Sequence, residues 1–131
     1  MIVVDASALT ELLLQTPLGS RVEARLFGGA DDLHTPHLLD VEIVQALRRL
    51  IRVGQVPADR AQEALEDLAD FNIRRHAHTD FLGRAWDLRD NLTAYDAIYV
   101  ALAEALDARL VTCDAPLAAA PGHAVRIEVI R

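Results

Sequence analysis

Four acidic residues that are far apart in the sequence stand where a carboxylate needs an explanation. They are Asp5, Glu42, Asp96 and Asp114. Asp5 and Asp114 follow the short apolar runs "IVV" and "LVTC". Asp96 lies near the start of the otherwise apolar stretch "LTAYDAIYVALAEAL", and Glu42 lies beside the apolar face of a long helical pattern. Carboxylate oxygens are the ligands that Mg²⁺ and Mn²⁺ prefer, so a cluster of these four would support metal-assisted hydrolysis.

Three of these acids also have a purely structural explanation in helix capping. Asp5 and Asp114 stand directly before helical segments, where an acidic side chain is a good N-cap, and for either residue alone capping is the better explanation. Asp96 falls three residues after Thr93, which is the spacing of a capping box. Capping and a chemical role explain Asp96 equally well.

Glu42 lies on the flank of a helix that the pattern predicts from His37 to Val53. At about 100° per residue, the apolar face of this helix consists of Leu39, Ile43, Ala46, Leu47 and Leu50. Glu42 stands at the edge of that face, where a carboxylate is more costly than in water. It could instead reach solvent or pair with Arg49, which explains it as well as a site does.

The four positions taken together outweigh the explanations taken singly. Two carboxylates about 5 Å apart, at an effective dielectric constant near 20, repel by roughly 3 kcal/mol. Six such pairs would approach ~20 kcal/mol, which exceeds the whole stability of a typical domain. Such a cluster must be partly protonated or must hold cations. Zinc is disfavoured, because the chain has one cysteine and its five histidines show no zinc-ligand spacing.

The elements that would position these acids alternate between strands and helices. Strands are expected at Ile2–Val4, Leu33–Thr35, around Ile73, at Ala108–Cys113 and, nearer an edge, at Val125–Ile130. Helices are expected from Ala6 to near Pro17, at Gly19–Phe27, His37–Val53, Pro57–Phe71, Asp80–Leu92 and 92–106, with a short one after Asp114. This order predicts an α/β fold, in which a parallel sheet is covered on both sides and ligands bind beyond the carboxyl ends of the strands.

Composition excludes several classes of protein. The 131 residues suit a single domain, 1–131, and the net charge of −7 argues against a basic nucleic-acid binder. All 13 basic residues are arginines, which excludes a P-loop and Schiff-base chemistry because both need lysine. No apolar run approaches the roughly 20 residues of a membrane span, and the start "MIVVDAS" lacks the basic region of a signal peptide. With Cys113 as the only cysteine, we expect a cytoplasmic protein.

These segments resemble the PIN-domain family, and more narrowly the small VapC-type ribonuclease toxins. The resemblance rests on "VVDASAL", "LLDVEIVQALRR", "LTAYDAIYVALAEAL" and "LVTCDAPL", in this order across nearly the whole chain. It implies a three-layer α/β/α sandwich around a parallel sheet. It also implies a Mg²⁺ or Mn²⁺ site made by Asp5, Glu42, Asp96 and Asp114, with the Ser7 and Thr112 hydroxyls nearby. Family members cleave RNA, and many pair with a cognate antitoxin and form homodimers.

The corresponding mechanism is a hypothesis at this point. Asp5 and Asp96 would be the main ligands, and Glu42 and Asp114 would add ligands or orient the attacking water. In-line attack would leave a 5′-phosphate and a 3′-hydroxyl. Ser7 and Thr112 would fix the carboxylates by hydrogen bonds, although ordinary turn and cap bonding explains them too.

Other features concern the partners of the site. Arg49 and Arg52 fall beside Glu42 on the helical wheel and could steer RNA phosphates, although a solvated helix face explains either one alone. An antitoxin segment could bind near Gly19–Phe27 and His37–Phe71. Receiver domains and haloacid-dehalogenase phosphatases are disfavoured because both lack their essential lysine here. A non-catalytic binding module and a DNA-directed nuclease of the same family stay open.

Overall fold

A five-stranded parallel sheet forms the centre of the molecule, in the order β3-β2-β1-β4-β5. The computed structural model describes all residues, 1–131. The strands are β1 (Ile2–Val4), β2 (Leu33–Pro36), β3 (Arg74–His76), β4 (Arg109–Thr112) and β5 (Ile127–Val129). The inner strand β1 consists of three residues that are fully buried, which explains its unbroken apolar run.

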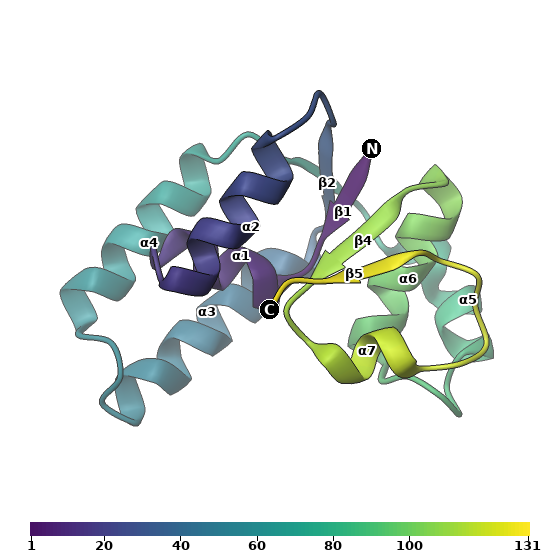
Figure 1. Ribbon diagram of the computed structural model, residues 1–131. Helices are drawn as coiled ribbons and strands as arrows, with labels where there is room; N and C mark the ends of the chain where they lie inside the picture. Colours follow the sequence, from purple (N-terminus) through teal and green to yellow (C-terminus); the bar gives the residue numbers. More distant parts are fainter.

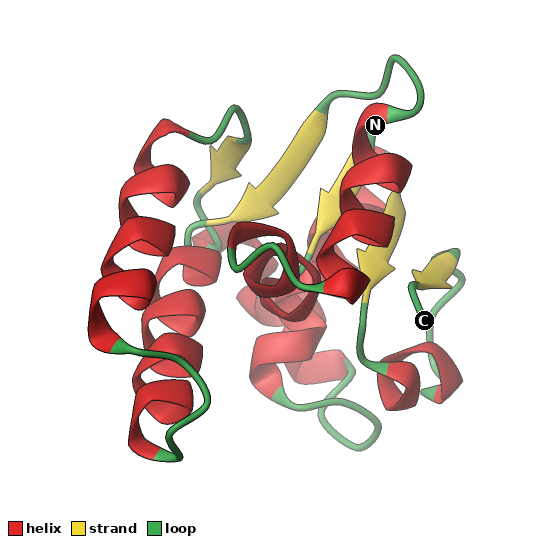
Figure 2. Ribbon diagram, turned by 60° about the vertical axis from the view of Figure 1, so that its left-hand side comes forward, coloured by secondary structure: helices red, strands yellow, loops and turns green.

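Helices cover both faces of this sheet (Figure 1). They are α1 (Ala6–Leu13), α2 (Pro17–Phe27), α3 (Leu38–Arg52), α4 (Ala58–Asp70), α5 (Leu82–Asp87), α6 (Ala94–Leu106) and α7 (Ala115–Ala119), with a 3-10 turn η1 (Thr79–Phe81) before α5. The chain moves from β1 outward to β3 and then returns to β4 and β5. Because parallel crossovers are right-handed, α1–α4 lie on one face of the sheet and α5 and α6 on the other, whereas α7 lies beside β5 (Figure 1, Figure 2). The α/β sandwich predicted from the sequence is confirmed.

Helix α6 is the buried helix of the fold, and its sequence explains why. Seven consecutive residues from Ala97 to Ala103 are buried, and the helix contacts β1, β2 and β4. Small alanines on several sides let it lie close to the sheet, and Thr93 caps its first turn. Asp96 is therefore carried to the sheet by a helix that has almost no freedom to turn.

The predicted elements are found, with differences in their bounds. Helix α1 ends at Leu13 rather than near Pro17. Helix α2 begins at Pro17 rather than Gly19, because the Thr16 hydroxyl caps it and proline suits the first helical position. The third strand begins one residue after Ile73. In α4 the buried face consists of Ala61, Ala64 and Leu68, whereas Leu65 is 37% exposed.

The largest error concerns the helix predicted from Asp80 to Leu92. Only the 3-10 turn η1 and the six residues of α5 are helical, and the segment 88–92 forms turns. Asp90 and Asn91 fall in this segment, and both residue types favour turns because their side chains compete for backbone hydrogen bonds. None of the helices combines the length and the apolar character that crossing a bilayer requires.

Candidate active site

Asp5 and Asp114 follow the carboxyl ends of the adjacent strands β1 and β4. These strands are paired in register, with Val4 opposite Val111, and the Asp5 backbone N–H donates to the Val111 carbonyl at 3.2 Å. Asp114 is the second residue after the end of β4. Strand order reverses between β1 and β4, which is where open parallel sheets bind ligands.

Asp5 is the most buried acid of the four and is held by three donors. Its side chain is 5% exposed. Oδ1 accepts from the Ser7 hydroxyl at 2.7 Å and from the Ala8 backbone N–H at 3.0 Å, and Oδ2 accepts from the Thr112 hydroxyl. Burial raises the pKa of Asp5, and these three hydrogen bonds oppose that rise. Asp5 therefore does cap α1, but capping uses only one of its oxygens.

The Ser7 and Thr112 hydroxyls join the ends of the two strands. Besides donating to Asp5, the Ser7 oxygen accepts from the Cys113 backbone N–H, and the Thr112 oxygen accepts from the Asp114 backbone N–H, both at 2.9 Å. Because each hydroxyl has one proton and both protons go to Asp5, the 3.2 Å separation of the two hydroxyl oxygens is a contact. The result is a fixed orientation of the Asp5 carboxylate.

Asp114 differs from Asp5 in having no such support. It occupies the position before α7, but its side chain makes no capping bond. The capping explanation that the sequence offered for Asp114 is therefore wrong. Its carboxylate is near enough to raise the pKa of both Asp5 and Asp96 by repulsion.

Asp96 comes from the opposite face of the sheet, in the first turn of α6. Its backbone N–H donates to the Thr93 hydroxyl at 3.2 Å, but the return bond of a capping box, from the Thr93 backbone N–H to the Asp96 carboxylate, is not formed. Partial burial raises the pKa of Asp96, and repulsion from Asp114 and Asp5 raises it further, against a smaller opposing effect of Thr93. The half-formed box leaves the carboxylate without a capping role.

Glu42 is brought to the same region by α3, where Leu39, Ile43 and Leu47 are buried as the helical wheel predicts. Its Oε1 accepts from the Tyr99 hydroxyl at 2.7 Å, and no ion pair with Arg49 forms. Partial burial raises the pKa of Glu42, and the repulsion of Asp96 and Asp5 adds to this, whereas the Tyr99 bond opposes it.

Tyr99 is a site residue that sequence reasoning missed. It is 1% exposed and follows Asp96 by three residues, so both lie on one face of α6. A buried tyrosine hydroxyl needs a partner, and the acids of the neighbouring elements were the available ones. The need of a buried hydroxyl for a partner, considered on the face of α6 that carries Asp96, could have identified Tyr99 from the sequence.

The four acids influence one another, and none has a basic partner. The six ion pairs of the molecule all involve other acids. A set of four carboxylates with nearby hydroxyls and no arginine matches the donors of a hard divalent cation in type. As the side chains stand, however, no three of them are close enough to hold one ion.

The arginines that sequence analysis placed near the site lie further along α3. Arg49 and Arg52 are exposed and border a hollow of about 380 Å³. Arg48, which was not singled out from the sequence, borders it as well. The two predicted residues therefore border the same hollow, but they lie about two to three helical turns beyond Glu42 rather than beside the acids.

Comparison with known proteins bears on what such a site does. A family model for the PIN domain matches residues 2–122. Ribonuclease VapC12 of Mycobacterium tuberculosis (strain ATCC 25618 / H37Rv) is 42% identical over 133 residues, which cover 99% of either chain. Among solved structures, PAE2754 from Pyrobaculum aerophilum is 30% identical, with a TM-score of 0.67 over 98% of this chain and 83% of the other.

A second solved structure shows the fold alone, because its sequence is only 14% identical. It is VapBC2 from Rickettsia felis, bound to a DNA fragment from its promoter, with a TM-score of 0.69 over 98% of each chain. The family model and the full-length relative together confirm the resemblance that the four sequence segments carry. The chain belongs to the PIN-domain family, and its full-length relatives are VapC ribonucleases.

Proposed function

We propose that this protein is an endoribonuclease that hydrolyses RNA phosphodiester bonds with Mg²⁺ or Mn²⁺, and that it is the toxin of a toxin–antitoxin pair. One observation carries the proposal: four carboxylates lie near enough to repel one another in every pair except Glu42 and Asp114, and none of them has a basic partner. Its support from outside the chain is the name ribonuclease, given to a relative that matches over the full length.

The donors would divide into a fixed part and an adjustable part. Asp5 is fixed by Ser7 and Thr112, so it would provide the position around which the site forms. The Asp96 and Asp114 carboxylates are free of capping bonds, so they can rotate inward, as gathering three oxygens around one ion requires. A divalent cation bound there would lower the pKa of a water molecule and neutralise charge on the phosphate.

Glu42 would serve as the residue that orients the attacking water. Its Oε1 is occupied by the Tyr99 hydroxyl, which leaves the other oxygen to accept a proton from water. Its raised pKa brings it nearer to neutral pH, as suits a group that exchanges protons. In-line attack would leave a 5′-phosphate and a 3′-hydroxyl.

An antitoxin partner and a homodimer belong to the same proposal. One chain of the VapBC2 structure has the same fold as this chain, which supports a partner of that kind. Large apolar side chains of α3 are exposed, including Val44 at 49% and Ile51 at 39%, and a second copy or an antitoxin would cover these two. An antitoxin arginine placed among the four acids would inhibit by occupying the position of the cation.

The test is cleavage of RNA by the purified protein. Labelled single-stranded RNA should be cut with Mg²⁺ or Mn²⁺ present, and not in excess EDTA. The products should carry 5′-phosphates, detected by their ligation to an adaptor without prior phosphorylation. Binding without cleavage would favour a non-catalytic module, and cleavage of DNA in preference to RNA would favour a DNA-directed nuclease. Cleavage that persists in EDTA would overturn the metal-dependent reaction.

A further inference from the structure

The last turns of α3 carry three arginines whose charges nothing in the chain neutralises. Arg48, Arg49 and Arg52 are exposed, form no hydrogen bond or ion pair, and border one hollow of about 380 Å³ together with Gln45 and Val53. Five other arginines do form ion pairs, namely Arg25, Arg60, Arg75, Arg84 and Arg109. In a protein of net charge −7, acids to pair with are not scarce.

The spacing of these arginines is unfavourable for the isolated helix. Arg52 lies four residues after Arg48 and three after Arg49, and like charges at both spacings destabilise a helix. The negative C-terminal end of α3 offsets part of this repulsion, but it would do so for cations on any side of the helix. Their position around one hollow indicates a polyanionic ligand.

A second hollow connects this basic surface to the acids. Its volume is about 440 Å³, and it is lined by Leu38, Val41, Glu42, Gln45 and Tyr95. Gln45 lines both hollows, so together they form one strip along α3. From Glu42 to Arg52 the strip extends about 15 Å along the helix axis, at 1.5 Å per residue. It begins at a residue of the candidate active site and ends at the three arginines.

Tyr95 gives the strip an exposed aromatic ring beside the acids. Its side chain is 60% exposed, and it directly precedes Asp96 in the first turn of α6. A flat apolar ring in water, next to a site for phosphate chemistry, can stack an unpaired base. An acidic peptide would also pair with the arginines, but it has no row of flat bases to stack on the ring.

We propose that this strip, Glu42 to Arg52 on α3 together with Tyr95, is the binding track for the substrate strand, which must be single-stranded. The track rests on the proposed ribonuclease function and deepens it. Tyr95 stacks the base next to the scissile phosphate. Arg48, Arg49 and Arg52 bind phosphates a few nucleotides away, where guanidinium groups contact two oxygens of a phosphate at once.

The first arm of the test measures how RNA affinity depends on salt. A fluorescein-labelled single-stranded RNA of mixed sequence is titrated with protein carrying Asp96→Asn, which prevents cleavage, in Mg²⁺. Each phosphate contact on a single strand contributes about 0.7 to the slope of log affinity against log salt, so replacing all three track arginines by glutamine should reduce the slope by about 2. Loss of affinity with an unchanged slope would overturn the phosphate contacts.

A matched control removes the same charge elsewhere. Arg74, Arg126 and Arg131 form no ion pair and lie outside both hollows, so their triple replacement by glutamine changes the net charge equally. We expect this control to retain the wild-type slope. If both triple variants lower the slope alike, net charge and not the track governs binding, and the proposal is wrong.

The second arm tests whether an unpaired base stacks on the Tyr95 ring. Tyr95→Ala should weaken binding of the single strand about tenfold with an unchanged salt slope, whereas Tyr95→Phe should bind like the wild type. A blunt duplex of the same sequence should bind more weakly than the single strand and should not respond to Tyr95→Ala. Equal binding of Tyr95→Ala and wild type, or a preference for the duplex, would contradict stacking.

The third arm separates this proposal from the proposed function. In the active protein, the triple track variant should raise KM about tenfold or more while kcat stays within a few-fold. If the wild type cleaves RNA in Mg²⁺ but the track variant keeps its KM, the track is wrong and the ribonuclease function stands. If the wild type does not cleave RNA with either metal, the proposed function itself fails. A track variant that loses only antitoxin binding would also refute the track.

Discussion

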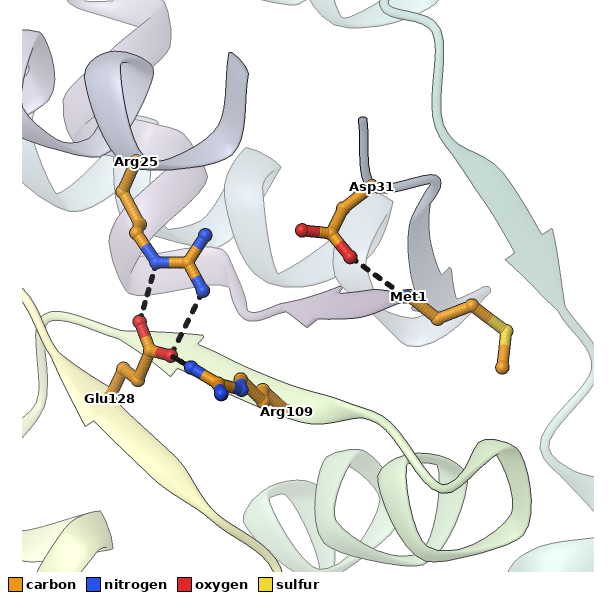
Figure 3. Close-up of polar contacts among 5 residues, drawn as sticks. All are labelled: Met1, Arg25, Asp31, Arg109 and Glu128. Carbon is orange, nitrogen blue, oxygen red and sulfur yellow. Dashed lines mark hydrogen bonds and ion pairs between the residues drawn. The ribbon is translucent and has the colours of Figure 1, made fainter. Parts of the chain in front are cut away.

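Two carboxylates on opposite sides of strand β4, Asp5 after β1 and Glu128 on β5, have opposite surroundings. Glu128 on β5 pairs in register with Val111 of β4, and Asp5 donates its backbone N–H to the same Val111. Glu128 lies between Arg25 and Arg109, with nitrogen-to-oxygen distances of 2.6, 2.9 and 2.7 Å (Figure 3). The two guanidinium groups lower the pKa of Glu128 to about 2. The pKa of Asp5 is raised, because it is buried with no cation near it.

The difference shows which charges serve the fold and which do not. The pair of Glu128 and Arg25 joins edge strand β5 to helix α2, and Arg109 extends the contact to β4. A second clamp, between the N-terminal amine of Met1 and Asp31 at 2.9 Å, lies at the start of β1 (Figure 3). The four acids without basic partners weaken the fold unless something else neutralises them. Residues that cost stability where they stand are characteristic of functional sites.

The largest expected effect is the loss of RNA cleavage when one of the four acids is neutralised. Asp96→Asn should reduce RNA cleavage by about a hundredfold or more, because it removes a charge that the reacting centre requires. Glu128→Gln changes one carboxylate in the same way and should leave cleavage within a few-fold. Initial rates on a labelled RNA in Mn²⁺ measure both. Similar losses in the two variants would show that cleavage follows stability and not the four acids.

The next largest effect is the loss of stability when Glu128 is neutralised. Lowering the pKa of Glu128 from 4.5 to about 2 corresponds to about 3 kcal/mol, of which about 2 should count because Arg109 is partly exposed. Glu128→Gln should therefore lower the free energy of unfolding by about 2 kcal/mol. Urea unfolding followed by circular dichroism at pH 7 measures it. A change within error would mean that the clamp contributes nothing.

The contributions of Glu128 and Asp96 to stability should depend on pH in opposite directions. The pKa of Glu128 is depressed in the folded state, so its contribution is complete above pH 4.5 and is lost as pH falls toward 2. The pKa of Asp96 is raised, so its charge opposes folding at pH 7, and this cost disappears as pH falls toward 3.8.

In EDTA at pH 7, Asp96→Asn should therefore have a higher free energy of unfolding than the wild type. This gain should be smaller than the loss caused by Glu128→Gln. The difference between Asp96→Asn and the wild type should disappear as the pH approaches 4. Urea midpoints across this range give the comparison. A wild type that is more stable than Asp96→Asn at pH 7 in EDTA would mean that the charge of Asp96 supports the fold.

The smallest effect concerns the Tyr99 hydroxyl. Tyr99→Phe removes the donor to Glu42 and leaves the ring in place, so the free energy of unfolding should fall by about 1 kcal/mol. Because the Tyr99 bond lowers the pKa of Glu42, its loss should raise that pKa further. The acidic limb of the pH–rate profile should then move to higher pH, with kcat reduced a few-fold. If the acidic limb of the profile stays at the wild-type pH, the ionisation that limits the rate is not that of Glu42.

The sequence predicted where the acids stand better than what supports them. Asp5 and Asp114 follow from the rule that parallel strands end at one edge, and Glu42 follows from the periodicity of α3. The hydrogen bonds of Ser7 and Thr112 to Asp5 were expected only from the family resemblance. Thr112 and Asp5 are 107 positions apart, and their bond depends on the pairing of β1 with β4, which no local pattern specifies. The Glu128 clamp was missed for the same reason: its three residues belong to three different elements.

Helix bounds were predicted well at the end of α3 and the start of α6, and less well for α1, α2 and the segment 80–92. Thr93 and Gly54 mark the start of α6 and the region after α3, and both predictions hold within two residues. The segment 80–92 has apolar residues at near-helical spacing, so periodicity favoured a helix over its whole length. The turn preference of Asp90 and Asn91 decided its last part instead.

The most direct measurement is calorimetric titration of the protein with Mn²⁺ at pH 7, in the absence of RNA. The wild type should take up Mn²⁺, Asp96→Asn should take up little or none, and Glu128→Gln should bind like the wild type. This pattern would show that the four acids without basic partners form the cation site. No uptake by the wild type, or equal uptake by wild type and Asp96→Asn, would contradict it.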